Sequence, residues 1–146
     1  MASDGVTGDP AGWPIERVRE EIASSLPVAG LFGFEIDSLD AAGCTILIPD
    51  GPNLRRPGGS VAGPVLFAAA DVGCFALVLT RNGPGIAATV DLIVHFLRPA
   101  DRLPLVARTV PVRFGRRLAT FETSVAARDA PDRMVARATA TWVVGT

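Results

Sequence analysis

The sequence predicts an α+β domain in which one strongly curved antiparallel sheet wraps around a long buried helix. The helix is predicted by the stretch Gly63–Leu79, which is apolar on every side, rich in Ala and Leu, and has Pro64 near its start. A hairpin pattern precedes this stretch, and a meander of alternating segments follows it. Because an antiparallel sheet has one face to bury and this helix needs cover on all sides, the two are expected to pack together. The sheet can cover only part of the helix, so a second subunit is expected to cover the rest.

Composition describes one compact domain without the charge of a nucleic-acid binder. The chain has 146 residues, of which 49% are hydrophobic and 20% charged, and its formal net charge is -1. We expect a loose tail over residues 1–12 and a single domain over residues 13–146. The N-terminus lacks the basic and then apolar run of a signal peptide, and Asp71 interrupts an apolar helix that is slightly short for a membrane span. The cytoplasm is therefore the expected location, with no membrane and no nucleic acid as partners.

Chemistry-bearing side chains are few, and this narrows the kinds of site. Cys44 and Cys74 lie far apart and fit no metal-binding spacing. His95 is the single histidine, so a zinc site or a Ser-His-Asp triad within one chain is not expected. Cys74 would need His95 as its base to act as a nucleophile, and a small buried core residue is the favoured interpretation. No metal and no redox cofactor are predicted.

Local signals place the remaining elements. The loop ahead of the apolar helix is rich in Gly, Pro and Asn, and Pro104 and Pro111 push the strand that contains them toward an edge or a bulge. The expected elements are, in chain order, a helix over 14–26 that Pro27 ends, strands over 34–39 and 44–49, a loop over 50–63, the helix over 63–79, and strands over 86–97, 103–114, 118–128 and 134–144.

The one charge inside the apolar helix is Asp71. Burying a lone carboxylate costs several kcal/mol unless it is paired or hydrogen-bonded. Asp71 therefore either holds the structure together, by capping a neighbouring loop or by pairing with an Arg across a dimer, or works at a functional site. We favour the functional site, because acids with perturbed pKa values concentrate at such sites.

Four motifs in a fixed order resemble those of a known family. Its members share a helix start with an acid several residues in, a strand that ends in a Phe-Leu-Arg-Pro corner, a Gly-Arg turn and a late Val-Ala-x-Ala-Thr strand. Here the matching pieces are AGP at 62–64 followed by Asp71, TVDLIVHFLRPA at 89–100, GRR at 115–117 and MVARAT at 134–139. The chain thereby resembles, over about residues 31–144, the hotdog-fold thioesterases of the phenylacetate-degradation (PaaI-like) type.

The resemblance implies hydrolysis of an acyl-CoA thioester to the free acid and CoA, with CoA present only as part of the substrate. The family's acid falls on Asp71, as general base on water or as nucleophile, and its oxyanion donor falls on the backbone N–H of Gly63. A helix N-terminus offers free N–H groups and a favourable dipole, which agrees with that assignment. A hydroxyl that orients water in some members falls on Thr89, although a strand residue of good β-propensity is the plain alternative. Such sites usually span a subunit interface, so a homodimer or homotetramer is implied, in which Gly63 and Asp71 come from different subunits.

Further positions are expected at the substrate. Phe67 lines either the core or the acyl pocket, and the apolar walls suggest an aromatic or medium aliphatic acyl group. Arg116 and Arg117 follow a glycine turn and suit CoA phosphates, with an exposed solvated turn as the alternative. An Asn that some members carry falls on Arg56, or on Asn53 if the loop is re-registered.

The chain departs from the family at the residue before Gly63. The family's His, which helps to hold the thioester carbonyl near the oxyanion site, is Ala62 here. The change leaves two rivals open. One is an acyl-CoA-binding protein without turnover, and the other is a hydratase or dehydratase of acyl thioesters, which would pair an acid with a His.

Overall fold

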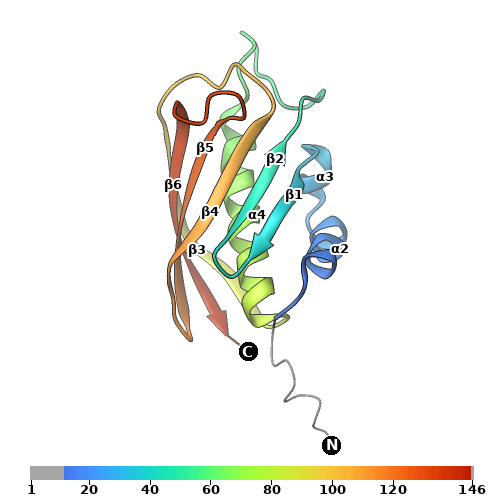
Figure 1. The fold of residues 1–146 in the computed structure, drawn as a ribbon, viewed down its shortest axis with the longest axis vertical. Helices are drawn as coiled ribbons and strands as arrows, with labels where there is room; N and C mark the ends of the chain where they lie inside the picture. The colour runs from blue at the N-terminus through green and yellow to red at the C-terminus, as the bar shows by residue number, and fades with distance from the viewer. Residues whose placement is uncertain (1–11, 146) are drawn as a thin grey trace, which may run out of the picture.

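A six-stranded antiparallel sheet wraps around one long helix in the computed structural model, which describes residues 12–145 (Figure 1). The strand order is β1-β2-β4-β5-β6-β3, and the predicted α+β architecture is confirmed. Apart from Gly12, the tail predicted over residues 1–12 lies outside the described residues. The elements are α2 (Ile15–Ser25), α3 (Pro27–Leu31), β1 (Glu35–Asp40), β2 (Gly43–Ile48), α4 (Gly63–Asn82), β3 (Ile86–Phe96), β4 (Leu105–Phe114), β5 (Leu118–Ala127) and β6 (Met134–Gly145).

Helix α4 is the axis of the domain. It begins after Ala62, whose φ of -68° and ψ of 142° are extended, and Pro64 lies in the first turn, where no N–H is required. The helix runs three residues beyond the predicted end, to Asn82, and stops where Gly83 takes a φ of 65°. Its length and apolar composition would suffice to cross a membrane, but 61% of that window is buried inside the described domain. The helix is therefore packed as a core element.

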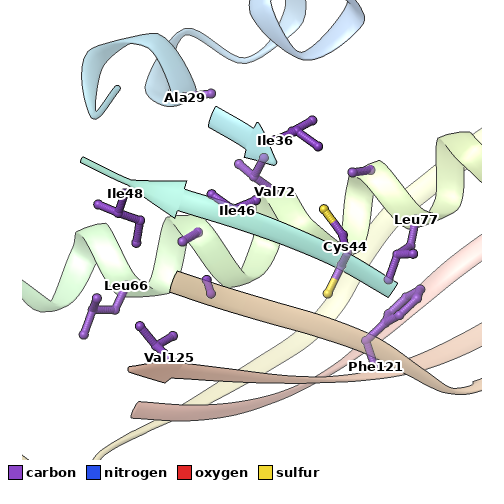
Figure 2. Close-up of a cluster of buried hydrophobic side chains, with 14 of the residues drawn as sticks. Ala29, Ile36, Cys44, Ile46, Ile48, Leu66, Val72, Leu77, Phe121 and Val125 are labelled. Carbon is purple, nitrogen blue, oxygen red and sulfur yellow. The ribbon is translucent and has the colours of Figure 1, made fainter. Parts of the chain in front are cut away.

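The core lies between α4 and the concave face of the sheet (Figure 2). Ile46 and Ile48 of β2, Val72 of α4 and Phe121 of β5 are all between 0% and 2% exposed. Their alternation along β2 and β5 turns every second side chain toward the helix, as the sequence pattern predicts for a sheet with one buried face.

Helix and sheet approach each other closely at Gly73. A Cβ on that residue would lie 2.4 Å from Thr109 Oγ1 of β4, so only glycine fits there. The Thr109 hydroxyl is also hydrogen-bonded to the Thr123 hydroxyl of β5, at 2.7 Å in the buried interior. A small residue on the helix thus leaves room for a satisfied polar pair beneath it.

Two interpretations of proline need correction. Pro27 does end the preceding helix, but it also begins α3, because proline is favoured in a first helical turn. The strand predicted near an edge, β4, lies inside the sheet between β2 and β5. The alternative of a bulge is confirmed, since the register with β5 shifts between Pro111 and Arg113. Pairing with β2 covers only Leu105–Thr109, so Pro111 meets no strand on that side and Pro104 precedes β4 altogether.

The sheet leaves one stripe of α4 uncovered, as the sequence predicts. Positions 64, 67, 68, 71 and 75 recur at helical spacing and are exposed or half-buried, whereas most of the helix is buried. Strand β3 lies at the edge of the sheet beside this stripe and also carries exposed apolar side chains. These are Ile86, Val90, Ile93 and Phe96, at 52–56% exposure.

Candidate active site

Asp71 lies in the middle of the uncovered stripe and is hydrogen-bonded to Thr89 of β3. Thr89 Oγ1 donates to Asp71 Oδ1 at 2.8 Å, and no ion pair to Asp71 is recorded among residues 12–145. Burial raises the pKa of the Asp71 carboxyl above its usual value, and the Thr89 hydrogen bond acts in the opposite direction. No residue among 12–145 therefore forms an ion pair with Asp71, and an Arg partner for Asp71 would have to come from a second chain.

Gly63 lies at the N-terminus of α4, about two helical turns before Asp71. Its N–H belongs to the first turn, whose amides have no partner inside the helix, and no loop acceptor for it is recorded among the described residues. Gly63 lines an open cleft of about 430 Å³ together with Arg56, Leu66, Phe96 and Arg98. A free donor, the helix dipole and a cleft thus meet at one point, which is the arrangement that stabilises a developing negative charge.

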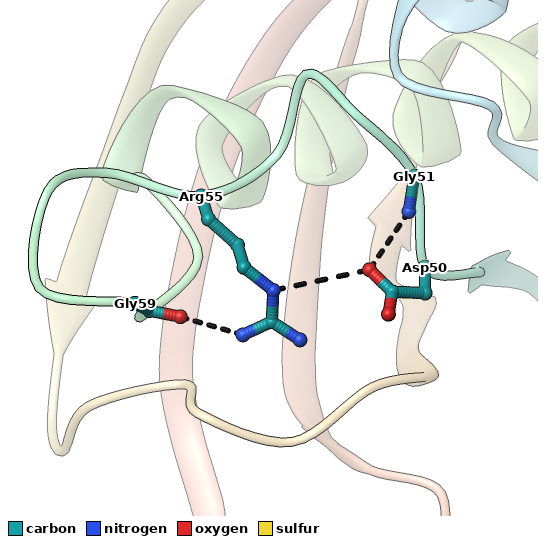
Figure 3. A network of polar contacts seen from close by, with 4 residues as sticks. All are labelled: Asp50, Gly51, Arg55 and Gly59. Carbon is teal, nitrogen blue, oxygen red and sulfur yellow. Dashed lines mark hydrogen bonds and ion pairs between the residues drawn. The ribbon is translucent and has the colours of Figure 1, made fainter.

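The loop that precedes α4 is braced by its own polar contacts (Figure 3). Arg55 Nε lies 3.8 Å from Asp50 Oδ1, its Nη1 donates to the Gly59 carbonyl, and Gly51 N–H donates to the same Asp50 carboxylate. The Val61 N–H donates to the Ala100 carbonyl at 2.8 Å, which ties the loop to the corner after β3. These contacts fix the direction from which the chain enters the helix at Gly63.

The two halves of the candidate site are separated within one chain. Asp71 follows Gly63 by eight residues on the same helix, which corresponds to about 12 Å of axial rise. The residues that line the Gly63 cleft do not include Asp71. One carbonyl cannot contact the Gly63 N–H and the Asp71 carboxylate of the same chain.

The other predicted positions near the helix start lie close to Gly63. Arg56 lines the cleft, and Ala62 is the residue immediately before the helix, its N–H bonded to the Leu54 carbonyl at 2.7 Å. Asn53 instead turns toward α3, where its side-chain amide donates to the Leu31 carbonyl at 3.3 Å. Between the two alternatives for the re-registered loop, the geometry therefore favours Arg56 at the cleft.

Aromatic side chains flank Asp71 along the uncovered stripe. Phe67 and Phe75 lie one helical turn before and after it, on the same face of α4. The sequence predicts Phe67 in either the core or the acyl pocket. Because its side chain is 45% exposed, it is not part of the closed core of a single chain. Phe75 stacks on Trp142 of β6, with ring centroids 6.1 Å apart.

Arg116 and Arg117 are far from Gly63 in the same chain. They occupy the turn between β4 and β5, at the end of the sheet that lies beside the C-terminus of α4 (Figure 1). There Arg81 of α4 lies 4.8 Å from the centroid of the Phe114 ring. A single chain does not bring these arginines to the Gly63 cleft.

His95 and Cys74 are not placed to act with Asp71 as a catalytic pair. His95 lies opposite Arg137 in the β3–β6 register, on the outer face of the sheet, where both side chains are exposed. Cys74 is 1% exposed, and burial raises the pKa of its thiol well above the usual value. The favoured reading of Cys74 as a core residue is supported.

Sequence reasoning missed a second cleft next to the first. A pocket of about 380 Å³ is lined by three arginines, together with apolar residues and Asp101, and it shares Arg98, Pro99 and Ala100 with the Gly63 cleft. The arginines come from two loops that are distant in sequence, 97–104 and 128–133, so no local sequence motif indicates that they lie together. They are Arg98, Arg102 and Arg133.

Comparison with known proteins identifies the class of protein that this fold and site define. The family model of the thioesterase superfamily matches residues 58–141, and the chain belongs to that superfamily. The arrangement of curved sheet and central helix is the hotdog fold, as the sequence predicts.

Individual relatives agree with that assignment. A thioesterase family protein from Silicibacter pomeroyi is 26% identical, with a TM-score of 0.80, over 88% of this chain and 96% of that one. A protein of Saccharolobus solfataricus with a provisional esterase name is 27% identical over 90% of this chain and 88% of its own length. The Escherichia coli PaaI protein from the phenylacetic acid degradation operon is 16% identical over 90% of this chain and 93% of that one. Its TM-score is 0.77, a likeness that concerns the fold alone.

Proposed function

We propose that the protein is an acyl-CoA thioester hydrolase whose active site forms between two subunits. The observation that carries the proposal is the state of Asp71. Its carboxylate lies among apolar residues, is bonded to Thr89 alone among the described residues, and faces an uncovered stripe of the helix whose N-terminus carries a free N–H. Membership of the thioesterase superfamily supports hydrolysis as the reaction.

In the proposed reaction, the thioester carbonyl oxygen accepts the Gly63 N–H. Ionised Asp71 either takes a proton from a water that attacks the carbonyl carbon, or attacks that carbon itself to give an anhydride that water then cleaves. Negative charge develops on the carbonyl oxygen in either route and is stabilised at the helix N-terminus. In the first route the carbon–sulfur bond breaks as the tetrahedral intermediate collapses, and the proton taken up by Asp71 passes to the CoA sulfur. In the second route that bond breaks as the anhydride forms and CoA leaves as the thiolate, and water then cleaves the anhydride to the free acid and the Asp71 carboxylate. Thr89 holds the Asp71 carboxylate in one orientation throughout.

A second copy of the chain supplies what one copy lacks. The separation of about 12 Å along the helix disappears if two α4 helices lie side by side and antiparallel, with Gly63 of one opposite Asp71 of the other. The uncovered stripe of α4 and the unpaired edge of β3 offer the surface for such a pairing, since an exposed sheet edge is a ready site for pairing with another chain. Further assembly into a tetramer is compatible with the same site.

CoA is the proposed carrier of the acyl group because guanidinium groups surround the clefts near Gly63. Arg56 and Arg98 line the first cleft, and Arg102 and Arg133 line the adjoining one. Arg98 donates to the Met134 carbonyl at 2.6 Å, and Arg102 lies 3.2 Å from Asp129. The remaining N–H groups of these arginines, and those of Arg56 and Arg133, suit phosphate oxygens. Phe67 beside Asp71 favours an aromatic or medium aliphatic acyl group, and the cytoplasm is the proposed compartment.

Thiol release from a panel of acyl-CoAs tests the proposal. We expect steady release of CoA by the wild type, and a loss of about 10²–10⁴-fold in Asp71→Asn, which keeps an acceptor for Thr89 but has no basic carboxylate. Asp37→Ala is the matched control, because Asp37 is an exposed strand aspartate that has no side-chain partner among residues 12–145. Release that survives in Asp71→Asn overturns the role of Asp71, and the absence of release from every acyl-CoA overturns the function.

Mixing two inactive variants tests the shared site. Gly63→Pro removes the N–H donor, and Asp71→Asn removes the base or nucleophile. In a mixed dimer of the proposed type, one site keeps both groups, so random mixing restores about a quarter of wild-type activity. A mixture that stays inactive, although mixed dimers form, shows that each chain builds its own site.

The rival that a specific observation favours is an acyl-CoA-binding protein without turnover. Ala62 stands where the family carries a His, and it provides no side-chain hydrogen bond at the helix start. Tight binding of acyl-CoA with the thioester intact would support that rival. The hydratase is disfavoured, because His95 is on the outer face of the sheet.

A further inference from the structure

Strand β3 carries a β-bulge directly beside Asp71. In the register with β6, Thr89 lies opposite Trp142 and Asp91 lies opposite Thr141, so that Val90 is an extra residue without a partner. Val90 is 56% exposed.

The bulge changes which residues of β3 face the helix. Before it the odd-numbered residues lie opposite buried residues of β6, and after it the even-numbered residues, including Leu92 and Val94, do so. In an unbulged strand, alternation would point Thr89 and Leu92 to opposite faces. The extra residue therefore allows one strand to bury Leu92 and Val94 and also to hold Thr89 Oγ1 at 2.8 Å from Asp71 Oδ1.

One side chain fastens this bulge to the neighbouring strand. Asp91 Oδ1 accepts a hydrogen bond from the Thr141 backbone N–H at 3.1 Å, and no ion pair of Asp91 is recorded among residues 12–145. A bulge disrupts the ladder locally, and a carboxylate is a strong acceptor for a main-chain amide. Asp91 lies on the face of the sheet opposite to Thr89, as their partners Thr141 and Trp142 do.

We propose that Asp91 is a positioning residue: by holding the Thr141 amide it fixes the bulge that keeps Thr89 hydrogen-bonded to Asp71. Asp91 acts through Thr89 and does not itself reach the reacting atoms. The inference rests on the proposed function only in taking Asp71 as the working group of the site.

The test compares variants that differ in one acceptor. Asp91→Ala removes the acceptor, whereas Asp91→Asn keeps an acceptor oxygen of the same reach and removes the charge. Asp37→Ala is the matched control, since Asp37 is the extra residue of the bulge in β1, between Ile36 and Ser38, and has no side-chain partner in the part of the chain that the structure describes. Asp91→Glu, which keeps the charge but displaces the acceptor by one methylene, replaces the Ala variant if that variant does not fold.

The first readout is the pKa of Asp71, measured by carboxyl ¹³C NMR, which needs no turnover. In Asp91→Ala the pKa of Asp71 rises relative to Asp91→Asn, because the Thr89 hydrogen bond to the ionised carboxylate is lost. Thr89→Val raises the same pKa, and adding Asp91→Ala to it produces no further rise. Equal pKa values of Asp71 in the Ala and Asn variants, or additive shifts in the double variant, overturn the proposal even if both variants lose thermal stability.

The second readout is catalytic. Where the wild type releases CoA, Asp91→Ala lowers kcat about fivefold with KM unchanged, and Asp91→Asn and Asp37→Ala stay within about twofold of the wild type. Equal losses in Asp91→Asn and Asp91→Ala contradict the positioning role. A wild type without turnover refutes the proposed function but leaves the NMR comparison able to decide the role of Asp91.

Discussion

Replacing Gly63 by proline is the most direct test of the oxyanion donor. Proline is well tolerated at the first helical position, where its missing N–H has no helical partner. The residue before it must be extended, and Ala62 already has φ -68° and ψ 142°. Gly63→Pro is therefore expected to fold while deleting the one N–H that the proposed mechanism assigns to the thioester oxygen.

The magnitude follows from comparison with alanine at the same position. A Cβ on residue 63 lies 3.2 Å from Phe96 Cζ, so both substitutions press on the same ring, which is 56% exposed and can give way. Gly63→Ala keeps the N–H and helps the helix slightly. The difference between the two variants is then the donor itself, and loss of one oxyanion donor costs about 10²–10³ in kcat, or about 2.7–4 kcal/mol.

The assay is CoA release under saturating acyl-CoA, with circular dichroism melting to confirm that both variants fold. We expect kcat for Gly63→Pro to fall about 10²–10³-fold below that of Gly63→Ala, with similar melting temperatures. If the two variants differ by less than about threefold, the Gly63 amide does not stabilise the transition state and the reasoning from the helix terminus fails.

Three further outcomes follow from the site and its support. Burial raises the pKa of Asp71 above its value in the unfolded chain, so Asp71→Asn raises the melting temperature at pH 7. That gain shrinks as pH falls toward the ordinary Asp value of about 3.9, and a pH-independent gain would contradict the assignment. Loss of the Thr89 hydrogen bond raises the pKa of Asp71 further. The acidic limb of the pH profile of kcat/KM therefore shifts to higher pH in Thr89→Val, and a limb at the same pH as in the wild type argues against the contact. Gly73→Ala forces a methyl group against the Thr109 hydroxyl and lowers the free energy of unfolding by about 1–3 kcal/mol in urea titrations, whereas Gly30→Ala, which meets nothing within 4 Å, does not.

Features that depend on local periodicity could be predicted from the sequence. The all-round apolar pattern predicts α4, the alternating segments predict the strands around it, and the lone charge predicts that Asp71 is exceptional. The short helix α3 is not predictable from the sequence, because five residues carry too little periodicity and a proline can end one helix or begin the next.

The bulge in β3 shows why the rest of the site was less accessible. Its signal is a change of phase, from Ala87 and Thr89 on one face to Leu92 and Val94 on the same face, within a segment that reads as one uninterrupted strand. A phase change of this kind becomes visible only when the partner strand is known, because pairing defines which side is buried. The grouping of arginines from two loops similarly depends on long-range packing.

The incomplete burial of α4 and the proposed chemistry are two aspects of one arrangement. A helix covered on all sides by its own sheet would hold Asp71 in a closed core, where a carboxylate is protonated or paired and no substrate arrives. The uncovered stripe leaves Asp71 half-buried, with a raised pKa and a face open to a thioester. In the proposed dimer, a second subunit laid on that stripe excludes water again while bringing in its own helix N-terminus. The proposed interface would then supply both the cover of α4 and the oxyanion donor, so it is expected to be required for activity and for full stability alike.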